Sequence, residues 1–441
     1  MLKEFENFVL ENYLFAHTDK LLVAVSGGAD SVALVDILSK NNYNFAIAHF
    51  NFRLRGADSE MDEIFVKNLA KKYNVQFFVE RTDTLQYAKD RKISVEMAAR
   101  KLRYDWFNSI IATNNLNFIV TAHHSDDNVE TILLNLAKKS GLRGLCGIPV
   151  KNNNVVRPLL FASKKLIMDY CNQNNLTYRT DHTNFETIYE RNKIRHLVIP
   201  QFKQVSNAFE QNVIETAKIL KKYQQLVDNM LFKFINYCTA QNSNSIEIDI
   251  QKSMEYEPIE LFYYEFLKNF GFNSDNVNNL LSSLNKPGNI FYSKTHKIFV
   301  ERNKIIVTPI IIADKQIIVV NKYELLNNIV LNTNKLTSEI VSFEDIKIDK
   351  NSNIAYFDID KLQFPIIFRH WQNGDYFYPF GLGRKKKISN FFVDKKIGSY
   401  QKINTWLMLS GNKIAWIVGH RTDERFKIDE KTKQVLVLKI Q

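Results

Sequence analysis

Short apolar segments alternate with helix-length segments over the first 130 residues. Residues 21–25 form a continuous apolar run, and residues 32–39 then resume an apolar spacing typical of a helix. Similar runs at 45–49, 75–79 and 117–122 predict three more strands, and the intervening segments 60–73, 95–114 and 126–137 predict helices. Strands that are apolar on both faces are typical of a parallel sheet covered by helices on each side. The pattern therefore predicts a Rossmann-like α/β domain, which we place at residues 1–207.

The pattern changes after this domain. Residues 208–236 predict one long helix with a polar face, and we expect it to begin a mostly helical middle domain over 208–325. The Asn-rich stretches 273–289 and 325–352 are weakly patterned and are interpreted as loops or boundaries. From residue 354 the chain becomes rich in β-type runs, with one helix-like piece at 388–393. We expect a small α+β domain at 354–441.

Charge distinguishes the last part of the chain from the rest. The 441 residues carry a net charge of +12, and residues 361–441 alone hold 16 basic and 6 acidic residues, a local net of +10. Such a concentration favours a surface for a polyanion, although a solvated basic face would give the same count. Arg384, Lys385, Lys386 and Lys387 are the densest cluster and are our candidates for binding RNA phosphates.

Composition excludes several classes of protein. The chain has 45% hydrophobic and 24% charged residues, which is typical of globular domains rather than disordered chains. The three cysteines form no C-x-x-C pair, so neither a disulfide framework nor a cysteine-based metal site is expected. We find no apolar run of the length a membrane helix needs and no signal-peptide layout. The expected location is the cytoplasm.

The first predicted strand is followed by Ser26, Gly27, Gly28, Ala29, Asp30 and Ser31, and then by a helix. Two glycines allow a tight turn whose N–H groups point inward, and the helix N-terminus adds partial positive charge. The two serines supply hydroxyl donors, and Asp30 can hold Mg²⁺ against phosphates. Without a following lysine this is not a Walker A loop. A plain turn is the simpler alternative, but the strand, the helix and the aspartate together favour a phosphate-binding loop.

This loop resembles the S-G-G-x-D-S loop of the N-type ATP pyrophosphatases, the PP-loop superfamily. Within that superfamily the chain is similar to the tRNA(Ile)-lysidine synthase family, on motifs at 49–55 (H-x-N-x-x-L-R), 96–104 (E-x-x-x-R-x-x-R-Y), 121–131 (T-A-H-H-x-D-D-x-x-E-T), 157–160 and 181–184. Arg369, Gly374, Asp375 and the lysines at 385–387 fit the last domain of the family. Phe52 stands where the family often has His, and we assign it no role.

The resemblance also implies residue roles. Asp127 and Glu130, three apart on one helical face, would grip the ammonium of a free lysine, and Arg103 would meet its carboxylate. The same two carboxylates could instead bind a metal, or could simply interact favourably with the positive end of the helix dipole. Asp30, His123 and Arg195 are the expected catalytic residues. Of the neighbouring cations Arg191 and Lys193, which could meet ATP phosphates or RNA, Lys193 fits a solvated face equally well.

The resulting hypothesis is an ATP-dependent RNA-modifying ligase. The resemblance implies that it joins L-lysine to C2 of the wobble cytidine of an isoleucine tRNA with anticodon CAU, with ATP and Mg²⁺, through an adenylated cytidine. A homodimer is compatible with this reading. One rival is a PP-loop tRNA thiolation enzyme of the 2-thiocytidine type, which the scattered cysteines disfavour. Another is an RNA-binding protein with a degenerate nucleotide site, which the intact phosphate loop disfavours.

Overall fold

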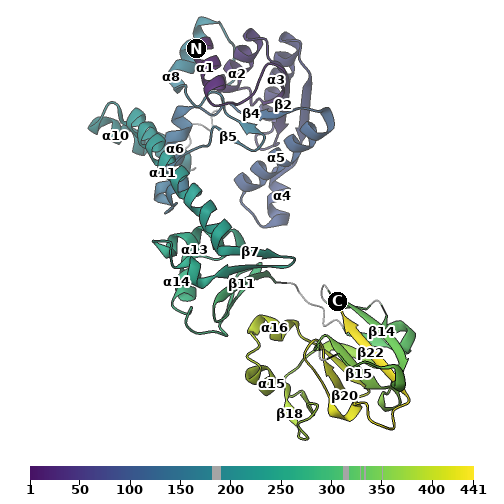
Figure 1. Ribbon diagram of the computed structural model, residues 1–441. Coiled ribbons are helices and arrows are strands. Elements are labelled where there is room, and N and C mark those ends of the chain that lie inside the picture. Colours follow the sequence, from purple (N-terminus) through teal and green to yellow (C-terminus); the bar gives the residue numbers. More distant parts are fainter. Residues whose placement is uncertain (181–189, 311–316, 328, 332–333, 350) are drawn as a thin grey trace. The chain divides into compact units, whose positions relative to one another are not determined.

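The computed structural model describes residues 1–180, 190–310, 317–327, 329–331, 334–349 and 351–441 (Figure 1). It divides into two units, Met1–Asp228 and Asn229–Gln441, each with its own sheets and cores. Within these residues no helix has both the length and the apolar character to cross a bilayer. The motif expected at residues 181–184 lies outside the described residues.

A six-stranded sheet forms the centre of the first unit. Its order is β3-β2-β1-β4-β6-β5, and only β5 runs antiparallel to its neighbour. The strands are β1 (Lys20–Ala24), β2 (Asn44–Asn51), β3 (Phe77–Arg81), β4 (Phe118–Val120), β5 (Lys151–Asn152) and β6 (Val155–Val156). Because β1 pairs in parallel with both β2 and β4, the winding reverses between β1 and β4, where sheets of this kind bind ligands at their carboxyl ends. The predicted parallel α/β sheet is confirmed.

Helices cover both faces of this sheet (Figure 1). Leu21 and Val23 of β1 pack into one core, and Leu22 between them packs into the other, as the two-residue period of a strand requires. The first core includes α1 (Leu2–Glu11), α2 (Ala29–Lys40), α3 (Ala57–Lys72) and α8 (Lys164–Gln173), and the second includes α5 (Val95–Asn114). The remaining helices are α4 (Thr84–Arg91), α6 (Ser125–Ala137) and α7 (Leu142–Leu145).

A series of helices leads out of the first unit. After α9 (Glu190–Lys193) come a π-helical turn, η2 (Ile194–Val198), and α10 (Ile199–Val205). The 30-residue helix α11 (Phe209–Cys238) follows and confirms the long helix predicted from the sequence. The boundary between the two units falls within it.

The middle part of the chain contains more strand than expected. Helices α12 (Ile250–Ser253), α13 (Ile259–Leu267) and α14 (Ser274–Leu281), with η3 (Lys268–Phe270), bear out its helical character. Alongside them lies an antiparallel sheet, β7-β8-β11-β10-β9, which the mostly helical interpretation of 208–325 missed. Its strands are β7 (Thr239–Asn242), β8 (Ser245–Asp249), β9 (Ile290–Tyr292), β10 (His296–Val300) and β11 (Lys304–Pro309). They are three to six residues long, too short to show a period clearly.

The C-terminal part is built on two antiparallel sheets, β12-β16-β19-β20-β21 and β13-β14-β22-β15. These strands are β12 (Ile318–Val320), β13 (Ile329–Leu331), β14 (Asn334–Ser342), β15 (Ile354–Asp358), β16 (Ile366–His370), β19 (Trp406–Ser410), β20 (Lys413–Ile417), β21 (Arg421–Thr422) and β22 (Gln434–Ile440). A two-stranded piece, β17 (Tyr376–Phe377) with β18 (Lys386–Lys387), and helices α15 (Ile388–Asp394) and α16 (Ser399–Asn404) complete the fold. Four single turns are η4 (Tyr323–Leu326), η5 (Phe343–Asp345), η6 (Ile359–Lys361) and η7 (Glu424–Phe426).

The C-terminal sheets begin before residue 354, where we expected the domain to start. β12 pairs with β16, and β14 pairs with β22 over seven residues from Leu336 to Ser342. The stretch 325–352, interpreted as a loop or boundary, therefore contributes two strands. β14 was missed because exposed or half-buried polar residues fill most of its length, which hides the apolar signal of a half-covered strand.

Candidate functional site

The loop 26–31 connects β1 to α2 at the carboxyl edge of the sheet. Gly27 has φ +94°, a conformation that strongly favours glycine, and this turns the backbone into the N-terminus of α2. The Ser31 hydroxyl donates to the Gly28 carbonyl at 2.9 Å, and the hydroxyls of Ser26 and Ser31 lie 3.4 Å apart. The loop is thus braced internally, with helical N–H groups at its end, as an anion site requires.

Asp30 lies in the first turn of α2, and its carboxylate pairs with a lysine of α8. Lys164 Nζ lies 2.6 Å from Asp30 Oδ1. No group of three or more His, Cys, Asp or Glu side chains suited to a metal occurs among the residues described in the structure. A single carboxylate beside a phosphate loop still fits Mg²⁺, because that ion commonly takes one or two carboxylates together with substrate phosphates. Lys164 was not predicted, because nothing in its local sequence distinguishes it from a solvated lysine.

Two histidines follow β4, next to β1 in the sheet, and their environments are opposite. His123 bonds through Nδ1 to the Thr121 hydroxyl at 2.9 Å. Burial lowers the pKa of His123 to about 4; Asp127 opposes this shift, while Arg157, Arg191 and Arg103 add to it. His123 is consequently a neutral imidazole at pH 7.

His124 is buried among three aspartates and was assigned no role from the sequence. Its Nε2 lies 3.6 Å from Asp127 and 3.9 Å from Asp30, and its Nδ1 lies 3.8 Å from Asp126. Burial opposes protonation, but the three aspartates outweigh it and raise the pKa of His124. The His124 ring therefore connects the phosphate loop electrostatically to the start of α6.

The predicted carboxylate pair is brought together on α6, and arginines hold it. Glu130 is almost fully buried, with 1% of its side chain exposed, and accepts from Arg191 Nε at Oε2 and from Arg195 Nε at Oε1, both at 2.5 Å. Asp127 accepts from Arg191 at 3.0 Å and from the His124 backbone N–H at 3.0 Å. Burial alone would raise the pKa of Asp127, but His124 and Arg191 hold it below its usual value.

Arg103 of α5 has aromatic neighbours and no acidic partner in the described part of the chain. Its guanidinium lies 5.9 Å from the centre of the Phe52 ring and 5.6 Å from that of Tyr104. Burial lowers the pKa of Arg103, with a further contribution from Arg100. A half-buried guanidinium without a counter-charge is a favourable place for a substrate carboxylate.

The predicted site residues in this unit therefore gather around the carboxyl ends of β1 and β4. Those missed are Lys164, His124 and the role of Arg191. Arg191 could have been assigned with Arg195, because residues four apart on a helix share a face and can meet the same carboxylate.

The cations predicted to bind RNA lie in the second unit, on and beside β18. Arg384, Lys385 and Lys387 are exposed. Lys385 Nζ stands 3.5 Å above the Tyr376 ring, while Lys386 is held by Asp394 at 2.5 Å and is less exposed. Phe391 and Phe392 are buried in the core, as expected. Three of the four cations thus face solvent, and none of these three pairs with a carboxylate among the described residues.

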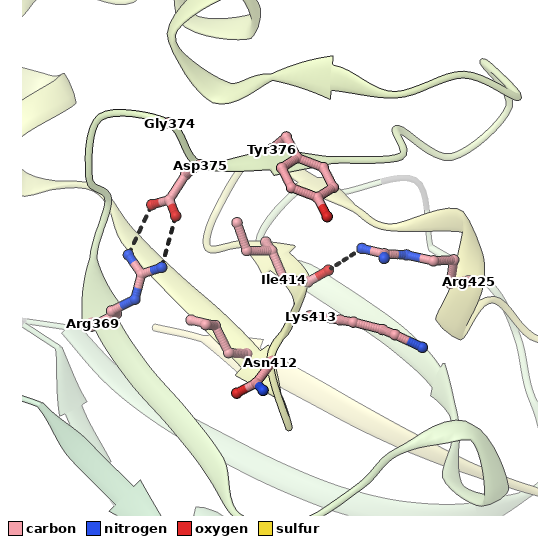
Figure 2. A pocket seen from close by; sticks show the side chains of 9 residues that line it. Arg369, Gly374, Asp375, Tyr376, Asn412, Lys413, Ile414 and Arg425 are labelled. Carbon is pink, nitrogen blue, oxygen red and sulfur yellow. Dashed lines mark hydrogen bonds and ion pairs between the residues drawn. The ribbon is translucent and has the colours of Figure 1, made fainter.

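A small cavity of about 100 Å³ lies beside this cluster (Figure 2). Arg369 and Asp375 line one side of it and form a bidentate pair, with both N–O distances 2.8 Å (Figure 2). On the other side Arg425 pairs with the fully buried Asp423 at 2.8 Å and covers the Tyr378 ring at 4.6 Å. These two ion pairs hold the loops of the domain, so Arg369 and Asp375 have a structural role here.

The fold and the loop define a PP-loop nucleotide-binding protein, and family comparison agrees. The family model described as PP-loop domain matches residues 1–202. Two more, described as TilS substrate binding domain and TilS substrate C-terminal domain, match 241–310 and 366–439.

Three curated relatives, each named tRNA(Ile)-lysidine synthase, match over nearly the whole chain. That of Bacteroides thetaiotaomicron is 38% identical and covered to 98% in both chains, and that of Parabacteroides distasonis is 37% identical and covered to 97% in both. That of Porphyromonas gingivalis is 34% identical over 96% of this chain and 94% of its own. The chain belongs to the tRNA(Ile)-lysidine synthase family, and is accordingly a ligase-type enzyme with a PP-loop ATP-binding domain.

Proposed function

We propose that the protein ligates L-lysine to C2 of the wobble cytidine of the CAU-anticodon isoleucine tRNA, using ATP and releasing AMP and pyrophosphate. The observation that carries the proposal is the meeting, at one sheet edge, of an internally braced phosphate loop and a buried carboxylate pair. The first suits a triphosphate, and the second suits an ammonium.

The reaction requires two displacements. The C2 oxygen of cytidine attacks the α-phosphorus and pyrophosphate leaves, which turns a poor leaving oxygen into a good one. The ε-amine of lysine then attacks C2, and AMP leaves. Bound Mg²⁺, held by Asp30 and the phosphates, would offset the charge that develops on pyrophosphate.

The side chains of this site divide the remaining work. The loop N–H groups hold the triphosphate, Asp127 and Glu130 position the ammonium of lysine, and Arg103 binds its carboxylate. Burial lowers the pKa of His123 to about 4, so we assign its neutral ring to orienting the reacting groups by hydrogen bonding, and the proton that the amine loses passes to solvent. Arg195 would stabilise phosphate charge.

The exposed cations beside β18 are proposed to hold the tRNA away from the anticodon. Two tRNAs share a CAU anticodon, so discrimination requires contacts elsewhere, and exposed lysines and arginines near aromatic rings suit an RNA backbone. The middle sheet is a second candidate surface, since its residues match the substrate-binding family model.

A sulfur-transfer function is disfavoured by the environment of Cys171. This thiol is the cysteine beside the phosphate loop, 3.7 Å from the Ala29 carbonyl. Burial, with a smaller contribution from Asp30, raises its pKa to about 11, so it is a poor thiolate at pH 7.

One experiment tests the proposal directly. The protein is incubated with ATP, Mg²⁺, labelled lysine and, separately, the isoleucine and methionine tRNA transcripts that share the CAU anticodon. We expect lysine in the isoleucine transcript alone, with AMP released in equal amount. No lysine in either RNA contradicts the proposal.

A further inference from the structure

Asp127 and Glu130 of α6, proposed above to bind lysine and here called the lysine cage, already have a donor on each carboxylate oxygen. The donors are Arg191, Arg195 and the His124 backbone N–H. One carboxylate oxygen of Glu130 accepts from Arg191 and the other accepts from Arg195. Arg191 continues from Glu130 to Asp127, meeting its carboxylate at 3.0 Å and its backbone carbonyl at 3.1 Å. Arg195 reaches Asp127 only at 3.8 Å. Of these two arginines, Arg191 is the one that bridges both carboxylates at hydrogen-bonding distance.

Charge balance limits what else this cage can hold. Two carboxylates face two guanidiniums, so the four charges cancel. The ammonium of a substrate would be a third cation on two carboxylates, in a place where Glu130 is shielded from water. Like charges at such distances repel strongly when they are desolvated. His124, Asp30 and Asp126 adjoin this set of four charges, but the two guanidiniums contact the pair directly. We therefore expect one guanidinium to withdraw when an ammonium binds.

The contacts indicate which of the two guanidiniums leaves the carboxylates when an ammonium binds. An ammonium gripped by both carboxylates needs the space between them, and Arg191 fills that space. Arg195 can remain on Glu130, which leaves two anions, one guanidinium and one ammonium, a neutral set. More than a third of the Arg191 side chain is exposed, so its head can swing into solvent by rotation about side-chain bonds.

Contacts other than those of the Arg191 side chain also join α9 to α6. Glu190 pairs with Lys138 at the end of α6, which ties α9 to the helix that carries the carboxylates. The turn that follows is π-helical, a geometry often found at functional sites. Displacement of Arg191 therefore needs no unfolding of α9.

We propose that Arg191 is an internal competitor for the lysine site, occupying the position of the substrate ammonium and setting the affinity for lysine. This inference rests on the proposed function of Asp127 and Glu130 as the lysine cage. A site that is partly occupied by a side chain of the protein itself binds substrate more weakly, because the apparent dissociation constant is the intrinsic one divided by the fraction of sites left open. The guanidinium also keeps the buried carboxylates paired until an ammonium replaces it.

The test is the effect of Arg191→Gln on lysine, measured on the full chain with the isoleucine tRNA. We expect the KM for lysine to fall about tenfold, because a charged hydrogen bond from Arg191 no longer competes with the ammonium of lysine. The KM for ATP should stay within about twofold of the wild-type value. A residue that merely supported the cage would raise the KM for lysine instead. An unchanged or raised KM for lysine overturns the proposal.

Two further variants separate charge competition from general loosening. Lys193→Gln removes the same charge from an exposed position on α9 and should leave the KM for lysine unchanged. Arg191→Lys keeps a cation but loses the fork that spans both carboxylates, so its KM should lie between wild type and Arg191→Gln. If Arg191→Gln does not fold, a KM for Arg191→Lys at or above the wild-type value overturns the proposal.

A direct binding measurement makes the two proposals distinguishable. In a calorimetric titration, Arg191→Gln should bind L-lysine about tenfold more tightly than wild type does, in line with the fall in KM. Guanidinium chloride at millimolar concentration should abolish this gain in the variant, and the same concentration of sodium chloride should not. Absence of lysine incorporation by the wild type contradicts the proposed function. Normal incorporation with equal lysine affinity in both proteins contradicts only the role of Arg191.

Discussion

The catalytic site of the first unit and the basic cluster of the second use charge in opposite ways. Around α6, Asp127, Glu130 and their arginines are buried or half-buried and satisfy one another. Beside β18, Arg384, Lys385 and Lys387 are exposed to solvent. Removing one partner of a buried charge pair is costly, whereas exposed charges act weakly and additively, and their effect falls as the salt concentration rises. We therefore expect substitutions in the first region to change catalysis or the use of lysine, and substitutions in the second to change the affinity for tRNA.

The largest effect is expected for Asp30→Ala. If its carboxylate holds Mg²⁺ against the phosphates, its loss should lower the rate of pyrophosphate release by roughly 100-fold or more, with tRNA binding nearly unchanged. Lys164 loses its partner but is 41% exposed, so water can take the place of Asp30. Pyrophosphate release and filter binding of tRNA are the two measurements.

The matched control is Asp169→Asn, on the exposed side of α8. It removes a carboxylate from the helix that carries Lys164, and it should leave both measurements unchanged. Near wild-type pyrophosphate release by Asp30→Ala would exclude Asp30 as the metal residue and remove the contrast between the two regions.

Asp127→Asn and Glu130→Gln should come next. Each removes one charged partner of the ammonium, so the KM for lysine should rise about 10- to 100-fold while the KM for ATP changes far less. Glu130→Gln should also lower the thermal stability, because two guanidiniums would then face a neutral amide at a buried position. Steady-state kinetics and thermal denaturation check the two effects.

Glu215→Gln is the control for these variants, because Glu215 is an exposed carboxylate of α11 that pairs with Lys218 and contacts neither Asp127 nor Glu130 in the described residues. Its KM for lysine should equal that of wild type. If Asp127→Asn raises the KM for lysine and the KM for ATP equally, Asp127 binds the metal and not lysine.

The two regions also differ in how well the sequence predicts them. The parallel sheet and its loop could be predicted because strands buried on both faces are continuously apolar and the loop has a fixed order of residue types. The middle sheet and β14 could not, since short antiparallel strands with one exposed face carry little apolar signal.

Residue types at the site could be predicted, but their partners could not. Asp127 and Glu130 share a helical face, which the spacing fixes. That Arg191 spans them depends on how the segment after residue 189 returns to α6, and that is a tertiary contact with no local pattern. Likewise, nothing in the run 384–387 shows that Lys386 alone is tied to an aspartate.

A smaller effect is expected for joint neutralisation of Arg384, Lys385 and Lys387 to Gln. Because each contacted phosphate adds about 0.7–0.9 to the slope of log affinity against log salt, losing two or three contacts should flatten that slope by about 2 and weaken tRNA binding. Truncation at residue 354 is a poor alternative test, because it removes β22, the partner of β14.

Lys386→Gln is the control for this series, since Lys386 already pairs with Asp394. Filter binding between low and moderate salt should give it nearly the wild-type slope. A triple variant that keeps the wild-type slope would mean that the cluster does not touch RNA.

The smallest expected effect is a pH dependence of stability confined to the buried site. The pKa of His123 is lowered to about 4, so between about 6.5 and 4 the unfolded chain takes up a proton that the folded chain refuses, and stability falls as the pH falls. The pKa of His124 is raised by its aspartates, so its contribution is fully present below about 6.5 and is lost as the pH rises through its folded pKa. The first loss of stability lies below about pH 6.5 and the second above it, so between pH 5 and pH 8 the two contributions partly offset each other in wild type.

Relative to wild type, His123→Asn should gain stability at pH 5 compared with pH 8, by on the order of 1 kcal/mol. His124→Asn should lose stability at pH 5 compared with pH 8. Melting temperatures across pH 5–8 check this, with the Arg384, Lys385 and Lys387 triple variant as reference, because those cations do not titrate in that range. Shifts of the same sign for both histidines would mean that the aspartates do not hold a proton on His124.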